Sequence, residues 1–206
     1  MLSLALFTDK KFLAIFFRRV KRNSTGRYEE EFPYVSPCGP ETNYIRCDDL
    51  PVVFTQLLDQ NGQPIQDIET HGNSPLIENK DERHSSDLQT SSTRTTKSNS
   101  DHTASSSQHL GNSCPEVLSY GGAGESLTVP FQPEKLCMLP EGGRVYHAGP
   151  DKLEGVGLVK SSLAIELSRF FVYKDGASES SSPVGFRWRG VTWTIDGSTV
   201  RRLREL

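Results

Sequence analysis

The sequence has few cysteines, no long apolar run and an interior segment without aromatic side chains. Its four cysteines are spaced too irregularly for a disulfide framework or a zinc-binding pattern, so no metal site is expected. No apolar run approaches the roughly 18 residues of a membrane-spanning helix, so no transmembrane segment is predicted. From Asp59 to Ser113, 55 residues contain no Phe, Trp or Tyr. Such a segment cannot bury a hydrophobic core.

The 34% hydrophobic content and the net charge of -3 are averages over two unlike parts. Residues 1–58 and 114–206 hold every aromatic side chain and carry a net charge of +1, which is typical of one ordinary globular domain. Residues 59–113 are acidic, polar and rich in Ser and Thr, which predicts a disordered, low-complexity insertion. Because loop-closure entropy grows slowly with length, the insertion is tolerated between two strand ends. We therefore expect Leu57 and Val117 to lie close together.

The hydrophobic pattern predicts a β-rich α+β fold, with one amphipathic N-terminal helix packed on a mostly antiparallel sheet. Thr8 or Asp9 is a suitable N-cap for a helix over residues 9–22, which has one apolar arc and one basic arc. Residues 161–173 fit a helix and a strand, and the aromatic run 170–173 favours the strand. Residues 201–204 are expected to form a frayed, cationic end. Further strands are predicted at 32–35 (an edge strand, because of Pro33), 44–47, 52–57, 117–120, 126–129, 143–147, 155–160, 186–188 and 191–195, with a turn at 36–40.

Basic side chains are concentrated in the first helix and just after it. Between Asp9 and Arg27 there are seven Lys or Arg residues and a single acid. Three interpretations fit this block: a domain helix with its charges in water, a phosphate-binding face, or a mitochondrial presequence. The first is favoured, because cations near the helix C-terminus also suit the helix dipole. The near-neutral charge of the domain argues against a nucleic acid partner.

A glycine-rich loop is a candidate ligand-binding element. Gly121, Gly122 and Gly124 could present backbone amides to a phosphate. Phosphate-binding loops require a helix after the glycines, whereas here a strand follows, so a hairpin turn is favoured. Glu125 is a candidate acid if the loop lines a pocket.

The side chains able to support chemistry are scattered along the sequence. His147, at a strand end, is a candidate base, and Asp48 or Asp49 a candidate acid or metal ligand. Arg27 is a candidate anion anchor, and a thiol could come from Cys38 or Cys47. Asp48 and Asp49 also suit a turn ahead of Pro51, and this interpretation is favoured.

No motif assigns a nucleophile, a base and an orienting group together. We therefore expect a non-catalytic module that binds an unidentified small ligand or protein, and the sequence indicates no particular cofactor. The alternative is a small-pocket enzyme that uses His147 with Asp48 or Asp49 and Arg27. A structure that places these side chains around one pocket would favour the enzyme.

Several segments closely resemble uncharacterised protein family 0598, which has animal and bacterial members. These segments are 12–17, 24–29, 32–39, 45–55, 145–147 and 155–167. The resemblance implies a domain of unknown function and, from animal members, a mitochondrial location; the alternative is the cytoplasm. Relatives carry an aromatic hairpin before this point, so we expect an open strand edge and poor solubility. A fainter similarity to bacterial domain of unknown function 1285 implies two small β-rich lobes.

Overall fold

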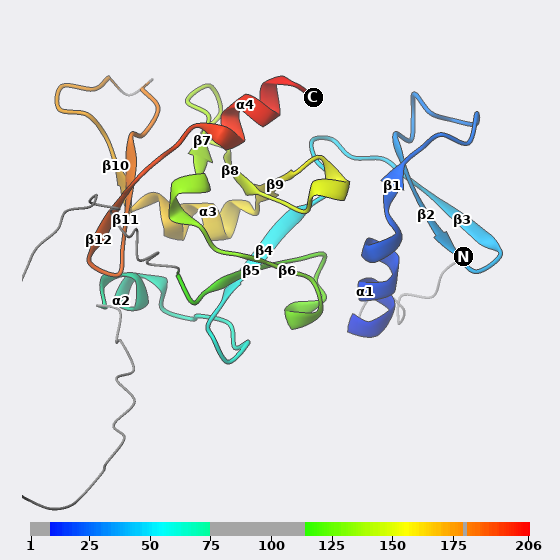
Figure 1. The fold of residues 1–206 in the computed structure, drawn as a ribbon, viewed down its shortest axis with the longest axis horizontal. Helices are drawn as coiled ribbons and strands as arrows, with labels where there is room; N and C mark the ends of the chain where they lie inside the picture. Colours follow the sequence, from blue (N-terminus) through cyan, green and yellow to red (C-terminus); the bar gives the residue numbers. More distant parts are fainter. Residues whose placement is uncertain (1–8, 75–113, 179–180) are drawn as a thin grey trace, which may run out of the picture. The chain divides into compact units, whose positions relative to one another are not determined.

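The computed structural model describes residues 9–74, 114–178 and 181–206, which belong to one compact unit (Figure 1). These residues contain four α-helices and twelve strands, so the predicted β-rich α+β class is confirmed. The helices are α1 (Lys10–Arg19), α2 (Ile68–Asn73), α3 (Ser161–Ser168) and α4 (Ser198–Arg204). The strands are β1 (Lys21–Arg22), β2 (Tyr34–Cys38), β3 (Glu41–Ile45), β4 (Val53–Leu58), β5 (Val117–Tyr120), β6 (Thr128–Pro130), β7 (Cys137–Met138), β8 (Val145–Ala148), β9 (Val156–Val159), β10 (Phe171–Val172), β11 (Gly185–Trp188) and β12 (Val191–Thr194).

The strands form three sheets in the described part of the chain. The largest has six strands in the order β6-β5-β4-β9-β8-β7, and two three-stranded sheets have the orders β1-β2-β3 and β10-β11-β12. Every pairing is antiparallel except that of β4 with β9. In Figure 1, the β1-β2-β3 sheet lies beside α1, and the β10-β11-β12 sheet lies near α2.

Helix α1 begins as predicted but ends three residues earlier. Asp9 caps it, because its Oδ1 accepts from the Lys11 amide at 2.8 Å. The chain becomes extended at Val20, and the next two residues form β1 instead of the predicted last turn. The pairing of β1 with β2 outcompetes helix propensity there.

Strand β2 corrects two predictions. It is the central strand of its sheet and not an edge, because β1 and β3 pair with it on either side. Pro33, on which the edge prediction rested, lies before the first residue of the strand. It also runs on through Ser36 and Pro37, which were predicted to lie in the turn. The turn begins at Gly39, whose φ of 64° lies in the left-handed region that glycine favours.

The central strands of the six-stranded sheet contribute to the hydrophobic core. Phe54 on β4 and Leu118 on β5 are fully buried in it. Leu57 pairs with Leu118 and Leu58 with Val117, so the expected approach of the two strand ends is confirmed. The glycine-rich loop joins antiparallel β5 and β6, as the hairpin interpretation predicted.

The start of the predicted insertion has regular structure. Pro64 forms a β-bridge with Leu58, and helix α2 follows at residues 68–73. Asp67 caps α2, and Ile68 is buried in the core. Composition missed this helix because one buried side chain and one cap suffice to anchor a six-residue helix. The Ser/Thr-rich tract from 75 to 113 lies outside the described residues.

The strand favoured for residues 161–173 is wrong for 161–168, which form helix α3, and it is right only at β10. Leu163, Ala164 and Leu167 are buried on one face of α3, and the strand pattern reappears in β10. The C-terminal basic run was wrongly expected to fray. It forms α4, which is anchored where the buried Thr199 hydroxyl donates to the Lys135 carbonyl at 2.6 Å. Among the described helices, none combines the length and apolar character needed to cross a bilayer.

Candidate functional site

His147 lies on β8 and is completely buried. Its Nε2 accepts from the Gln132 amide at 3.0 Å, and Nδ1 lies 2.7 Å from the Ala148 carbonyl, to which it donates. Its ring stacks on Phe131, with centroids 5.8 Å apart. Burial lowers the pKa of His147 to about 4, because desolvation disfavours the charged imidazolium. Both ring nitrogens are therefore occupied by backbone groups in the core.

Asp49 is held in a fixed position by two side chains from β8 and the loop before it. Its Oδ2 accepts from Arg144 Nη1 at 2.6 Å and from the Tyr146 hydroxyl at 2.8 Å. Burial, together with this hydrogen bond, raises the pKa of Tyr146, so the phenol remains a donor at neutral pH. The neighbouring Asp48 is exposed.

These aspartates line a cavity of about 430 Å³, which we call the Asp49 pocket. Its polar lining includes the Asp49–Arg144 pair, Asp48 and two of the three serines of α3, Ser161 and Ser168. Its apolar lining comes from β7, β8, β9 and α3. These apolar residues are Met138, Val145, Leu158, Val159, Ala164 and Ile165.

The other predicted site residues are elsewhere. Neither His147 nor Arg27 is among the described residues that line the Asp49 pocket. Arg27 is exposed in the loop between β1 and β2, where its carbonyl accepts from the Asn23 side chain at 2.9 Å. The structure therefore does not gather the proposed base, acid and anion anchor around one pocket.

The glycine-rich loop packs against α1. A Cβ on Gly121 would come within 2.5 Å of Phe17 Cδ2, and one on Gly122 would contact Leu13. Gly124 lies near the side chain of Lys10, and Glu125 packs against Gly62. These glycines therefore allow a close approach between the loop and the helix.

The cysteines are all free thiols. Cys38 lies 3.6 Å from the Ser36 hydroxyl, and burial raises the pKa of Cys47. Burial also raises the pKa of Cys114 to about 12 and that of Cys137 to about 11. Among the described residues, no group of three His, Cys, Asp or Glu side chains is placed to hold a metal ion.

A buried charged cluster was missed by the sequence analysis. Glu116 Oε1 lies 2.6 Å from Arg189 Nε and 2.8 Å from His71 Nε2, and Oε2 lies 3.4 Å from the Trp188 indole nitrogen. The signal in the sequence was Glu116 itself, a single acid directly before the apolar residues of the strand predicted at 117–120. The acid's partners come from residues far away in the sequence, so their approach could not be foreseen.

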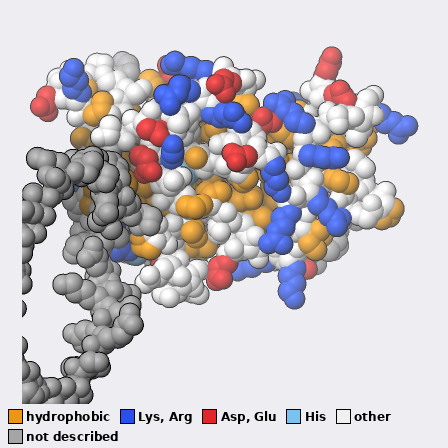
Figure 2. Space-filling model, viewed as in Figure 1, with side chains coloured by type: hydrophobic (Ala, Val, Ile, Leu, Met, Phe, Trp, Pro, Cys, Tyr) orange, Lys and Arg blue, Asp and Glu red, His pale blue; other side chains and the backbone are white. Residues whose placement is uncertain are grey.

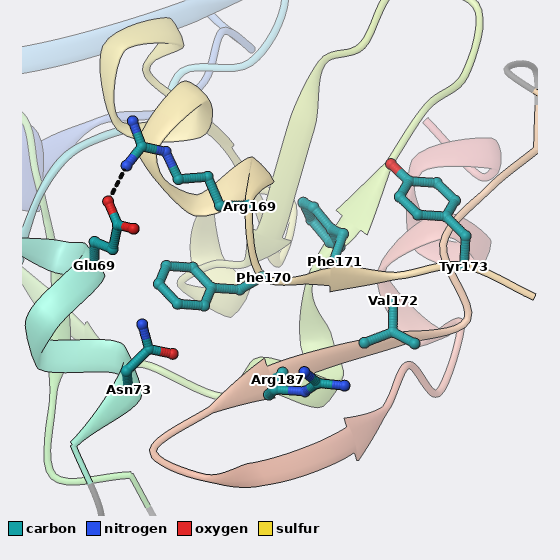
Figure 3. Close-up of a pocket in the computed structure, with 8 residues that line it drawn as sticks. All are labelled: Glu69, Asn73, Arg169, Phe170, Phe171, Val172, Tyr173 and Arg187. Atoms are coloured by element: carbon teal, nitrogen blue, oxygen red, sulfur yellow. Dashed lines mark hydrogen bonds and ion pairs between the residues drawn. The ribbon is translucent and has the colours of Figure 1, made fainter.

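A second cavity, of about 390 Å³, lies along β10 (Figure 3). We call it the β10 pocket. Arg169 and Glu69 form an ion pair on one side of it, and the Asn73 side chain points toward Phe170. Its lining residues are Glu69, Asn73, Arg169, Phe170, Phe171, Val172, Tyr173 and Arg187.

Three of the seven cations in the basic block contact other parts of the fold while they remain exposed to water. Arg18 donates to the Ser126 carbonyl at 3.0 Å, Arg19 to the Pro37 carbonyl at 3.3 Å, and Arg22 pairs with Glu154 at 2.7 Å. In Figure 2, blue Lys and Arg side chains gather over the part of the surface formed by α1 and β1. These contacts support the interpretation as a domain helix.

The structure thus defines a β-rich α+β domain that carries the Asp49 pocket and the β10 pocket, and the described residues do not bring His147, Arg27 and an aspartate together around either of them. The chain belongs to the family described as a domain of unknown function, DUF4505, whose profile matches residues 3–200. No solved structure matches the chain.

Proposed function

We propose that this protein is a non-catalytic binding module that holds a small molecule in the Asp49 pocket. The observation that carries the proposal is the fixed Asp49 carboxylate at a cavity with apolar walls. Ligand sites are typically concavities of roughly 300–1,000 Å³ with apolar walls and a few placed polar groups. The Asp49 pocket, at about 430 Å³, fits that description.

The charges of the pocket favour a particular kind of ligand. Asp48 and Asp49 face a single cation, Arg144, so the lining has an excess of negative charge. Arg144 and Tyr146 both bind Oδ2 of Asp49, and among the described contacts Oδ1 has no hydrogen-bond partner. A ligand with an ammonium or similar donor at one end and an apolar body would donate to Oδ1 of Asp49 and pack against the apolar lining.

The non-catalytic part of the proposal follows from the use of His147. A general base needs a ring nitrogen within reach of the substrate proton. Both nitrogens of His147 are bonded to backbone groups, and the residue is fully buried. The enzyme alternative thus lacks its proposed base in the described conformation.

The test is a titration of the ¹⁵N-labelled full chain with hexylamine and, separately, with hexanol, which shares the apolar body but lacks the charge. Hexylamine is expected to shift the amides of Arg144, Val145 and Ser161 with a lower Kd than hexanol. Asp49→Asn keeps the shape of the side chain but removes its charge, so it should abolish the preference. Asp175→Asn, on an exposed loop, is the control. Equal binding of both probes, or shifts mapped to other residues, would contradict the proposal.

We also propose a mitochondrial location, supported by the resemblance to family 0598. Fluorescence microscopy of the full chain with a C-terminal tag in animal cells tests this location. Colocalisation with a matrix marker is expected, and an even cytoplasmic signal would contradict it.

A further inference from the structure

Strand β10 is an edge strand in the described structure. The sheet order β10-β11-β12 gives it one hydrogen-bonded neighbour, β11, among the described residues. Phe171 pairs with Phe186 and Val172 with Gly185 on that side. An edge of this kind presents backbone N–H and C=O groups that can pair with another chain.

The β10 pocket reaches this backbone. Four consecutive residues, 170–173, line it. Successive side chains of a strand point to opposite faces, so a cavity confined to one face would touch alternate side chains only. A cavity that contacts all four therefore reaches the main chain as well. Figure 3 shows this alternation: Phe171 and Tyr173 point to one side of β10 and Val172 to the other.

The described lining of the pocket has an excess of one positive charge. Arg169 pairs with Glu69, whereas Arg187 is exposed and has no acidic partner among the described ion pairs. Arg187 lies on β11, the neighbour of β10 (Figure 3). Neighbouring strands lie about 4.8 Å apart, so a strand added beyond β10 would run about 10 Å from β11. The side chains of an arginine and a glutamate together span that distance.

Exposed apolar side chains extend this surface. Tyr173 is 42% exposed, and Val184, which donates its amide to the Val172 carbonyl at 2.9 Å, is 49% exposed. Large apolar groups beside an open strand edge are typical of sites that bind alternate side chains of an extended peptide.

We propose that β10 binds an extended acidic segment of a partner protein as an added strand. Main-chain hydrogen bonds to the free edge of β10 hold the segment, and one of its carboxylates pairs with Arg187. Alternate apolar side chains of the segment pack near Tyr173, and its carboxylates lie on the opposite face of the sheet, where Val172 and Arg187 are. This site shares no lining residue with the Asp49 pocket and does not depend on the function proposed for it.

The probe is an acetylated, amidated hexapeptide, Thr-Val-Glu-Val-Glu-Thr, titrated into the ¹⁵N-labelled full chain. Two control peptides isolate the two contributions. The first has Lys in place of both Glu residues. The second carries N-methyl groups on alternate backbone nitrogens and is made in two forms, with either the odd or the even positions methylated. The amides of residues 170–173 are expected to shift with the parent peptide, and both controls should bind about tenfold more weakly.

Variants of the protein complete the test. Arg187→Glu should weaken the parent peptide about tenfold and restore affinity for the Lys-containing peptide, which is a reversal that unfolding cannot produce. Arg46→Glu changes an exposed arginine outside the pocket and should have no effect. Equal binding of the N-methylated peptides, shifts away from β10, or a homodimer that buries β10 in sedimentation and NMR would each overturn the proposal.

Discussion

The Nε atom of Arg189 donates to Oε1 of Glu116 across 2.6 Å in the interior of the domain. The Glu116 side chain has no exposed surface, and that of Arg189 is 14% exposed. Arg189 occupies the turn between β11 and β12 with a positive φ of 52°, an unfavourable conformation for a residue with a Cβ. The ion pair therefore fixes this turn against the chain segment that leads into β5.

Removal of the Glu116 charge should destabilise the protein strongly. Glu116→Gln keeps the size of the side chain but leaves the largely buried Arg189 without its counter-ion. Breaking one partner of a buried pair costs about 3–5 kcal/mol in the free energy of unfolding. Urea denaturation followed by tryptophan fluorescence measures the loss.

Glu69→Gln is the matched control. It breaks the Glu69–Arg169 pair, whose side chains are 62% and 58% exposed. An exposed pair contributes about 1 kcal/mol or less. Similar losses for Glu116→Gln and Glu69→Gln would show that burial does not set the strength of the Glu116 pair.

Stability should fall as the pH is lowered from about 6.5 to about 4 because of His147. Burial lowers its folded-state pKa from 6.5 to about 4, so in this range the unfolded chain binds a proton that the folded chain does not. This stability is fully present above pH 6.5 and is lost as the pH falls to the folded pKa, at about 1.4 kcal/mol per pH unit. Urea midpoints at pH 7 and pH 5 give the slope.

The His147→Gln variant isolates that contribution, since the remaining titratable groups are unchanged. Between pH 7 and pH 5, the free energy of unfolding of the variant should change less than that of the wild type, because unfolding of the variant no longer takes up the proton of His147. Parallel pH profiles for the two proteins would contradict the assignment of His147 as neutral in the fold.

Gly121→Ala should cost more stability than Gly39→Ala. The two glycines have nearly the same φ, 65° and 64°, so both substitutions carry the same backbone cost of about 1–2 kcal/mol. A Cβ at Gly121 also clashes with Phe17, whereas one at Gly39 meets nothing within 4 Å. Overpacking adds roughly 1–3 kcal/mol at Gly121. Thermal unfolding compares the two, and equal losses would show that the loop does not pack tightly on α1.

Local patterns in the sequence were sufficient for much of the fold. The strands predicted at 186–188 and 191–195, which form β11 and β12, and the antiparallel β5–β6 hairpin follow from turn residues and alternation. The predictions are wrong where hydrogen-bonded pairing with a distant segment determines the local structure. Residues 21–22 continue a helical pattern, yet they form β1 because β2 offers hydrogen-bond partners.

The candidate site was less accessible to sequence reasoning. Asp48 and Asp49 were identified as candidates, and both line a pocket. Arg144, the partner of Asp49, lies 95 positions away, and its role depends on the way β8 returns to the loop before β4. His147 has an ordinary strand-end context in sequence. Its burial depends on Phe54 and Phe131, whose rings approach it only in the folded sheet.

The thiols of Cys114 and Cys137 should resist alkylation in the folded protein. Burial raises their pKa values to about 12 and about 11, and the carboxylates of Glu116 and Glu134 add to the effect at Cys114. Because the thiolate is the nucleophile, iodoacetamide at pH 8 should label them at least about 100-fold more slowly than in concentrated urea. Peptide mass spectrometry gives the rate at each cysteine, with the half-buried Cys38 as an internal comparison. Labelling of Cys114 at its urea rate would show that the segment leading into β5 opens readily, and the Glu116–Arg189 pair could then not hold it closed.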